Sequence, residues 1–334
     1  MAGRGPNRRA SRSGRSSACR WWLLGALAAL LLGSALAQEP PRGAELTGAG
    51  ARAGVSLRVT PARRARGVPS AAAAGERRVY VVTGATGRTG QLAWKLLRAS
   101  EGLAARALVR NATKARQLLQ CGACGPDEGV FVGDITRPAS LGAALEGAFG
   151  LIICTGSWPT KGADGKWSYP PGGFPVDVDW QGVVNQVMVA KGRGVRHVIL
   201  LSSMGTSKPY SYLDRLGDGF SLFYKLNAEA FLMQSRLPYT IVKPCGLTDK
   251  VVDLGTQVGN CDSFPHPRPV PIIARARVAG ILVAAASVWP DSSGSRFDVC
   301  ADPLRPMAKD DFQAIFQAAS DELGRCQNTP ADMF

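Results

Sequence analysis

The sequence predicts an α/β fold in which a doubly wound parallel sheet is covered by helices on both faces, with a small C-terminal lobe. Short apolar runs rich in β-branched residues alternate with helix-like segments from about residue 79 onward. These runs are apolar throughout, which is typical of parallel strands buried on both faces. The first run leads directly into a glycine-rich turn. Residues 79–334 are therefore expected to form one domain.

The elements are expected to follow one another in a regular strand–helix order. Each strand is a short run such as Val79-Tyr80-Val81-Val82, bounded by turn residues, and each helix is a longer segment with apolar residues at helical spacing. Two segments, 156–175 and 246–271, show neither pattern and are expected to be irregular loops. The expected strands are 79–82, 105–109, 129–132, 150–154, 197–201, 239–242 and 296–299. The expected helices are 91–99, 112–120, 138–147, 178–192, 223–235, 275–287 and 309–322.

Three glycines lie between the first expected strand and the first expected helix, in the stretch Thr83-Gly-Ala-Thr-Gly-Arg-Thr-Gly90. Glycines at this spacing let a turn close tightly and let the backbone approach a pyrophosphate, while amides at the helix N-terminus face the anion. The pattern alone is weak evidence, but its place between a strand and a helix supports it. We therefore predict a Rossmann-like dinucleotide site formed by Gly84, Thr86, Gly87, Arg88, Thr89 and Gly90.

The end of the second expected strand favours NADP over NAD as the cofactor. A NAD-binding protein places Asp or Glu there against the ribose 2′-hydroxyl, whereas this chain has Arg110, with Lys114 nearby. An arginine can bind a 2′-phosphate that an acid would repel. A simple solvent-exposed charge at the strand end is the alternative interpretation of Arg110.

Two further groups are placed near the cofactor by their position after a strand more than by their residue types. Asp134 and Ile135 follow the third expected strand and are expected to touch the adenine. The segment after the fourth expected strand is expected to line the nicotinamide side, through Cys154, Thr155 and Gly156.

Several longer stretches resemble the atypical short-chain dehydrogenases/reductases of plants, algae and cyanobacteria, close to NmrA-like proteins. They span nearly all of residues 79–300 and are together far more specific than the glycine pattern. The stretches are TGATGRTG (83–90), LVRN (108–111), GDIT (133–136), VDWQGVVNQV (178–187), HVILLSSMG (197–205) and KLNAEAFLMQSRLPYTIVKPCGL (225–247).

The resemblance implies a catalytic serine and lysine but departs from the family at the tyrosine. Ser203, or its neighbour Ser202, matches the serine after the fifth strand, and Lys225 matches the lysine that also holds the ribose. Classical members carry a tyrosine four residues before that lysine as the general acid. This chain has Ser221 there. Tyr224 lies on another face of the helix, and Tyr210 and Tyr212 lie in the preceding loop.

This departure leaves two classes of function open. The first is an NADP-dependent oxidoreductase that reduces a small carbonyl substrate, with a proton donor that the sequence does not identify. The second is a non-catalytic dinucleotide-binding redox sensor, or a scaffold for a protein partner, as the resemblance to plastid assembly factors and NmrA-like regulators implies. A weaker third interpretation is an epimerase that uses the cofactor transiently.

The N-terminal segment is expected to be an address. Six arginines and no acid precede an apolar run that ends in Ala35-Leu36-Ala37, which is the layout of a signal peptide over residues 1–37. Residues 38–78 are rich in Ala, Arg and Gly and resemble a transit peptide. Together they resemble the bipartite presequence of plastids of secondary endosymbiotic origin. Secretion and an uncut signal anchor are the alternatives; otherwise the mature chain is not expected to span a membrane.

The charge and the cysteines argue against two other classes. Residues 1–78 hold 14 Lys or Arg and 3 Asp or Glu, whereas residues 79–334 hold 26 and 22, so the body is nearly balanced and nucleic-acid binding is not expected. Cys121 and Cys124 form the one close cysteine pair, without a second pair or two nearby histidines. No metal site is therefore predicted, and these two thiols are expected to lie on a loop without a role. His197 is expected to be a packing residue.

Overall fold

The computed structural model describes residues 77–208, 211–252, 254–262, 272–306 and 312–322. The expected signal peptide and almost all of the expected transit peptide lie outside these residues. Residues 69–334 belong to one compact unit. In the described part of the chain, no helix is both long enough and apolar enough to cross a membrane.

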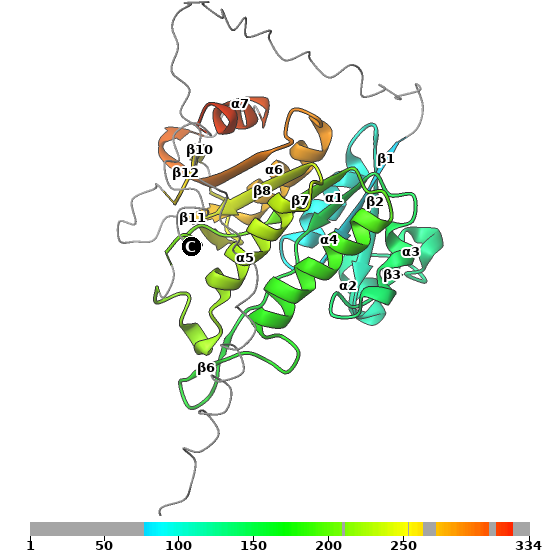
Figure 1. Cartoon of the computed structure of the whole chain (residues 1–334), viewed down its shortest axis with the longest axis horizontal. Helices are drawn as coiled ribbons and strands as arrows, with labels where there is room; N and C mark the ends of the chain where they lie inside the picture. The colour runs from blue at the N-terminus through cyan, green and yellow to red at the C-terminus, as the bar shows by residue number, and fades with distance from the viewer. Residues whose placement is uncertain (1–76, 209–210, 253, 263–271, 307–311, 323–334) are drawn as a thin grey trace, which may run out of the picture. The chain divides into compact units, whose positions relative to one another are not determined.

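An eight-stranded sheet forms the centre of the unit, in the order β10-β12-β8-β7-β4-β1-β2-β3 (Figure 1). Every neighbouring pair is parallel except β10 and β12, which run antiparallel at one edge. The predicted doubly wound parallel sheet is confirmed. The strands are β1 (Arg78–Thr83), β2 (Leu103–Val109), β3 (Val130–Val132), β4 (Gly150–Ile153), β7 (His197–Leu201), β8 (Tyr239–Pro244), β10 (Leu254–Gly259) and β12 (Ser295–Pro306).

Helices cover both faces of the sheet. One face packs against α1 (Gly90–Ala99), α2 (Ala112–Leu119), α6 (Arg275–Ser287) and α7 (Phe312–Glu322). The other packs against α3 (Gly142–Leu145), α4 (Gly182–Gly192) and α5 (Ser221–Gln234). Strand β1 shows how one sequence serves both layers, since Tyr80 and Val82 enter the first core and Val81 enters the second. This confirms that continuous apolar runs are strands buried on both faces.

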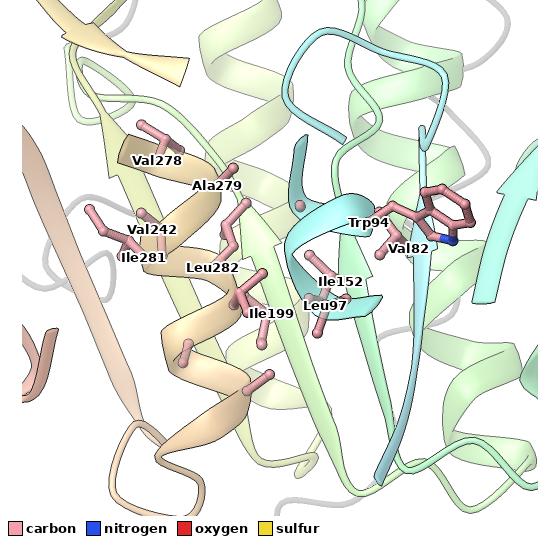
Figure 2. Close-up of a cluster of buried hydrophobic side chains, with 14 of the residues drawn as sticks. Val82, Trp94, Leu97, Ile152, Ile199, Val242, Val278, Ala279, Ile281 and Leu282 are labelled. Carbon is pink, nitrogen blue, oxygen red and sulfur yellow. The ribbon is translucent and has the colours of Figure 1, made fainter. Parts of the chain in front are cut away.

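The larger core lies between the sheet and the pair α1 and α6. Figure 2 shows Leu97 of α1 directed toward Ile152, Leu282 of α6 directed toward Ile199, and Trp94 of α1 directed toward Val82. These side chains are almost completely buried. Burying side chains of this size stabilises the fold by about 1.5–3 kcal/mol each. The core holds the strands rigidly, so that their carboxyl ends can carry a site.

The structure differs from the sequence prediction in four places. The expected helix 138–147 is reduced to η2 (Pro138–Ser140) and α3, and the expected helix 178–192 begins with a π-helical turn, η3 (Val176–Gln181). The first expected loop contains a hairpin of β5 (Thr160–Lys161) and β6 (Trp167–Ser168). The second contains β9 (Gly246–Thr248) and β10, with β11 (Ile272–Ala274) just beyond it. The short helices η1 (Pro126–Glu128) and η4 (Leu216–Asp218) complete the described elements.

Two disulfides cross-link the described residues. Cys121 and Cys124 lie on a loop, as expected. They are joined by a disulfide, so the expectation of two thiols without a role is wrong. Cys245 and Cys300, both buried, join the end of β8 to β12. The pairing follows from sheet topology, because Cys245 and Cys300 come from neighbouring strands that are far apart in the sequence.

Candidate functional site

The predicted site residues gather where the strand order of the sheet reverses. β1 and β4 are neighbours, yet β1 continues to β2 on one side and β4 continues to β7 on the other. In open α/β sheets the crevice at this switch point, outside the carboxyl ends of the strands, is where ligands bind. The glycine turn follows β1, and Cys154, Thr155 and Gly156 follow β4.

The turn after β1 is closed by contacts that only glycine permits. Gly84 has φ +65°, and a Cβ there would lie 2.7 Å from the carbonyl oxygen of Cys154. A Cβ on Gly90 would lie 2.2 Å from the carbonyl oxygen of Gly84. The amide of Gly87 donates to the same Gly84 carbonyl at 2.8 Å. The backbone is therefore packed tightly at the start of α1. This geometry fits a pyrophosphate.

The other residues of this turn differ in exposure. Thr86 is half-buried and Thr89 is buried at the start of α1. Arg88 is exposed and forms an ion pair with Asp249 at 3.2 Å. Pairs between exposed side chains of this kind contribute little to stability. Arg88 thus remains on the surface beside the turn.

Arg110 and Asp134 lie just beyond the carboxyl ends of the neighbouring strands β2 and β3. Arg110 is exposed at the end of β2. Asp134 Oδ1 accepts hydrogen bonds from the Thr136 amide at 2.9 Å and the Thr136 hydroxyl at 2.8 Å. Burial tends to raise the pKa of Asp134, but these bonds and the charges of Arg110 and Arg137 lower it overall. The carboxylate is therefore ionised and held by its own turn.

Ile135 and the segment after β4 differ in their burial and in their contacts. Ile135 is buried, and its carbonyl accepts a hydrogen bond from Asn185 of α4 at 2.8 Å. Burial raises the pKa of Cys154 to about 12, so this thiol is neutral and unreactive at neutral pH. Gly156 is exposed, and a Cβ there would lie 3.4 Å from Lys225 Nζ. The end of β4 and α5 thus meet at Gly156.

Lys225 is held by a carboxylate that the sequence interpretation did not identify. Its Nζ lies 2.6 Å from Oδ1 of Asp179, whose side chain is 1% exposed. Asp179 also accepts hydrogen bonds from the amide and the hydroxyl of Ser157. It lies in the π-helical turn η3, a feature that is frequent at functional sites. The signal for this role in the sequence was an acidic residue near the start of the expected helix 178–192.

Of the two serines after β7, Ser202 shares a small pocket with Lys225. The pocket is lined by polar Thr155, Asp179, Ser202 and Lys225 and by apolar Val183, Leu200, Leu201 and Ala228. The Ser203 hydroxyl instead donates to the carbonyl of Met204 at 2.9 Å. The Ser202 hydroxyl donates to Glu229, which forms a bidentate pair with Arg296 at 2.9 and 2.6 Å. Glu229 lies one turn after Lys225 on α5, so one helix positions both groups.

A buried ion cluster fixes the segment that follows these serines. Lys243 Nζ lies 3.1 Å from Asp262 and 3.4 Å from Asp298, and all three side chains are fully buried. Asp262 accepts the backbone amides of Gly205 and Ser207 at 2.7 and 2.8 Å. Burial tends to raise the pKa of Asp262, but Lys243 and these hydrogen bonds lower it to about 2. Lys243 thus acts through Asp262 on the chain after Ser203.

The remaining expected candidates lie apart from this site. His197 is fully buried between Tyr80 and Thr240, and burial lowers its pKa to about 3, which confirms its packing role. Tyr212 is 75% exposed, Tyr224 packs against Phe223, and Tyr210 lies outside the described residues. Among the described residues, no hydrogen bond joins Lys225 to Tyr212 or Tyr224.

A doubly wound sheet with a glycine turn at its switch point defines a dinucleotide-binding protein of the Rossmann class. A family model described as NAD(P)H-binding matches residues 84–287, most of the described chain. The chain belongs to this NAD(P)H-binding family. This confirms the expected dinucleotide and the resemblance to atypical short-chain dehydrogenases/reductases.

Individual relatives agree with this assignment. The chain is 35% identical over 264 residues to an uncharacterised chloroplastic protein of Arabidopsis thaliana, covering 76% of this chain and 79% of the relative. It is 32% identical over 263 residues to sanguinarine reductase of Eschscholzia californica, covering 71% and 94%. A solved structure of a candidate NAD-dependent epimerase/dehydratase from Bacillus halodurans aligns with a TM-score of 0.57 and 23% identity, over 72% of this chain and 99% of that chain. This last similarity supports the fold alone.

Proposed function

We propose that the protein is an NADP(H)-dependent reductase of a carbonyl substrate. The observation that carries this proposal is the cluster of Lys225, Asp179 and Ser202 beside Gly156, at the carboxyl ends of β4 and β7. The cluster lies across the switch point from the glycine turn, where the reacting end of a dinucleotide bound at that turn is expected. A relative that is named as a reductase supports the same class of reaction.

Different residues of the chain would have different roles in this reaction. The bound nicotinamide would supply the hydride. Lys225, held by Asp179, would bind the ribose hydroxyls and keep a positive charge near the developing alkoxide. Ser202, oriented by Glu229, would contact the substrate, because Ser202 and not Ser203 lines the pocket that holds Lys225. Lys243 and Asp262 would keep the segment after β7 in position.

The substrate that fits best is apolar and flat. Large exposed hydrophobic side chains are carried by the two segments that lead into η3 and α5, the helices that hold Asp179 and Lys225. They are Trp158, Trp167, Phe174, Tyr212 and Leu213, and Phe223 is exposed on α5 itself. Aromatic side chains bind flat apolar rings by stacking. An aromatic aldehyde such as para-nitrobenzaldehyde is therefore a suitable first probe. NADPH oxidation by the full chain with this probe supports the reductase, and tight NADPH binding without turnover across a panel of carbonyls contradicts it.

Arg110 is proposed to select NADP(H) over NAD(H) by binding the 2′-phosphate. Arg110→Asp is expected to weaken NADPH binding roughly 10–100-fold while leaving NADH binding nearly unchanged, because one charge-assisted interaction is worth about 1.5–3 kcal/mol. The measurement is a fluorescence titration of the full chain with each cofactor. Arg116→Asp, an exposed arginine on α2, is the matched control. An unchanged preference in the Arg110 variant overturns this role.

A second candidate function is a redox sensor or scaffold that binds the dinucleotide without turnover. It is favoured by one observation, the serine at position 221 where classical members of the family carry tyrosine. In this case the exposed aromatic side chains would serve a protein partner instead of a substrate. The turnover experiment above separates the two candidates.

The plastid is the proposed destination, and residues 1–78 are the proposed address. The chloroplastic relative supports this destination. Residues 1–78 fused to a fluorescent protein are expected to enter the plastid in an alga with a secondary plastid. The fusion with residues 38–78 alone should remain outside it, because the signal peptide of residues 1–37 provides the first step. Secretion of the longer fusion contradicts the plastid address.

A further inference from the structure

Reduction of a carbonyl requires a proton as well as a hydride. The family's tyrosine would project from α5 one turn before Lys225, and this chain has Ser221 at that position. Lys225 is paired with Asp179, and the Ser202 hydroxyl already donates to Glu229. A phenol from another element would complete the chemistry.

The segment before α5 is shaped around the ring of Tyr169, which follows β6 directly. A Cβ on Gly219 would lie 2.2 Å from Cε2 and 2.8 Å from the hydroxyl oxygen of Tyr169, and one on Gly217 would lie 3.2 Å from Cε2. The Tyr169 side chain is only 6% exposed. Glycines therefore admit the ring at the entrance to α5. Tyr169 thus packs against the segment that leads into α5, the helix that carries Lys225.

The Tyr169 hydroxyl lies beside the segment just before α5, because a Cβ on Gly219, two residues before Ser221, would be 2.8 Å from it. It is buried and makes no hydrogen bond of regular geometry within the described residues. Burial raises the pKa of Tyr169, as do the nearby carboxylates of Asp179 and Asp214, while the hydroxyl of Ser221 lowers it. Its neighbours are thus Ser221, at the position of the missing tyrosine, and Asp179, which binds Lys225. An unpartnered buried hydroxyl in such surroundings needs an explanation.

We propose that Tyr169, reaching in from the loop after β6, is the general acid that replaces the tyrosine missing from α5. This inference rests on the proposed reductase function. As the hydride forms the new C–H bond, the carbonyl π electrons move to oxygen, and the oxygen takes the proton of the Tyr169 hydroxyl. The product is an alcohol, the cofactor is oxidised, and the phenolate recovers a proton from water.

A purely structural role for Tyr169 is the competing explanation, since its ring also packs against Phe174 at 5.6 Å between centroids. Tyr169→Phe distinguishes the two roles because it keeps the ring and removes only the hydroxyl. The matched control is Tyr239→Phe, which removes the hydroxyl of a half-buried tyrosine at the start of β8, at the edge of the sheet opposite the site. The double variant Tyr169→Phe with Ser221→Tyr returns a phenol to the family's position.

The experiment follows NADPH oxidation by the full chain with para-nitrobenzaldehyde. Tyr169→Phe is expected to lower kcat roughly 10²-fold or more with an unchanged Kd for NADPH, whereas Tyr239→Phe keeps the wild-type rate. Partial recovery in the double variant supports the assignment. A kcat within about twofold of wild type in Tyr169→Phe overturns it while leaving the reductase intact. A wild-type chain that turns over no carbonyl overturns the reductase and, with it, the acid.

Discussion

Gly90→Ala is expected to abolish NADPH binding while leaving the chain folded. The new Cβ would lie 2.2 Å from the Gly84 carbonyl oxygen and 2.8 Å from its carbon, both backbone atoms that no side-chain rotation can move. The turn and the start of α1 must therefore separate, which misdirects the amides that would face the pyrophosphate. We expect the Kd for NADPH to rise roughly 100-fold or more, a loss of about 2.7 kcal/mol or more.

The control for this variant is Gly192→Ala at the end of α4. A Cβ at Gly192 meets no atom within 4 Å, and its φ is not positive. The same substitution should therefore leave NADPH binding unchanged. Circular dichroism of both variants tests whether the fold survives. Retained NADPH affinity in a folded Gly90→Ala protein would show that the dinucleotide does not use this turn.

Lys225→Met is expected to lower kcat roughly 10²-fold or more and to weaken NADPH binding, because this lysine would bind the ribose and stabilise the negative charge that develops on the substrate oxygen. Truncating one partner of a buried ion pair also leaves the 1%-exposed Asp179 uncompensated, which costs about 3–5 kcal/mol of stability. Lys225→Met combined with Asp179→Asn removes both charges and is expected to recover stability without recovering turnover. Steady-state kinetics and thermal unfolding of the two variants separate these effects.

The matched control is Lys95→Met, because Lys95 is an exposed lysine on α1 and the substitution is the same. It should change neither the melting temperature nor the rate of NADPH oxidation. If Lys225→Met, or its combination with Asp179→Asn, retains wild-type turnover, then Lys225 has no part in the chemistry. The scaffold function would then be favoured if NADPH binding also persists.

The parallel sheet could be predicted because its strands carry their own signal. β1, β4 and β7 are short apolar runs whose residues enter both cores, so composition alone marks them. The glycine turn is also local, since Gly84 and Gly90 contact one another within a few residues. Sequence patterns of this range are sufficient wherever the structure depends on near neighbours.

Strand β10 was not predictable in the same way, although part of its partner β12 was. β10 reads Leu-Gly-Thr-Gln-Val-Gly, which lacks both a continuous apolar run and many β-branched residues. It becomes a strand because it pairs antiparallel with β12, whose paired residues lie 39 to 52 positions later in the chain. Partners at such distances leave no trace in a local window, because tertiary contacts override propensity.

The site was predicted in part. Lys225 was placed correctly on its helix by family resemblance, but Asp179 comes from η3 and Tyr169 from the loop after β6, and only the fold brings them to α5. The sequence could not distinguish Ser202 from Ser203, because the difference depends on which of the two side chains faces α5 after β7 ends. In the structure the Ser202 hydroxyl donates to Glu229 of α5, which lies 27 residues further along the chain.

Titration of the full chain with NADPH, followed by cofactor fluorescence and repeated with NADH, tests the central claim most directly. The structure places a tightly closed glycine turn at the switch point of the sheet, and Arg110 follows the neighbouring strand β2. We predict saturable binding at one site per chain, tighter for NADPH than for NADH and lost in Gly90→Ala. An absence of saturable binding by either cofactor to the folded chain would contradict the account.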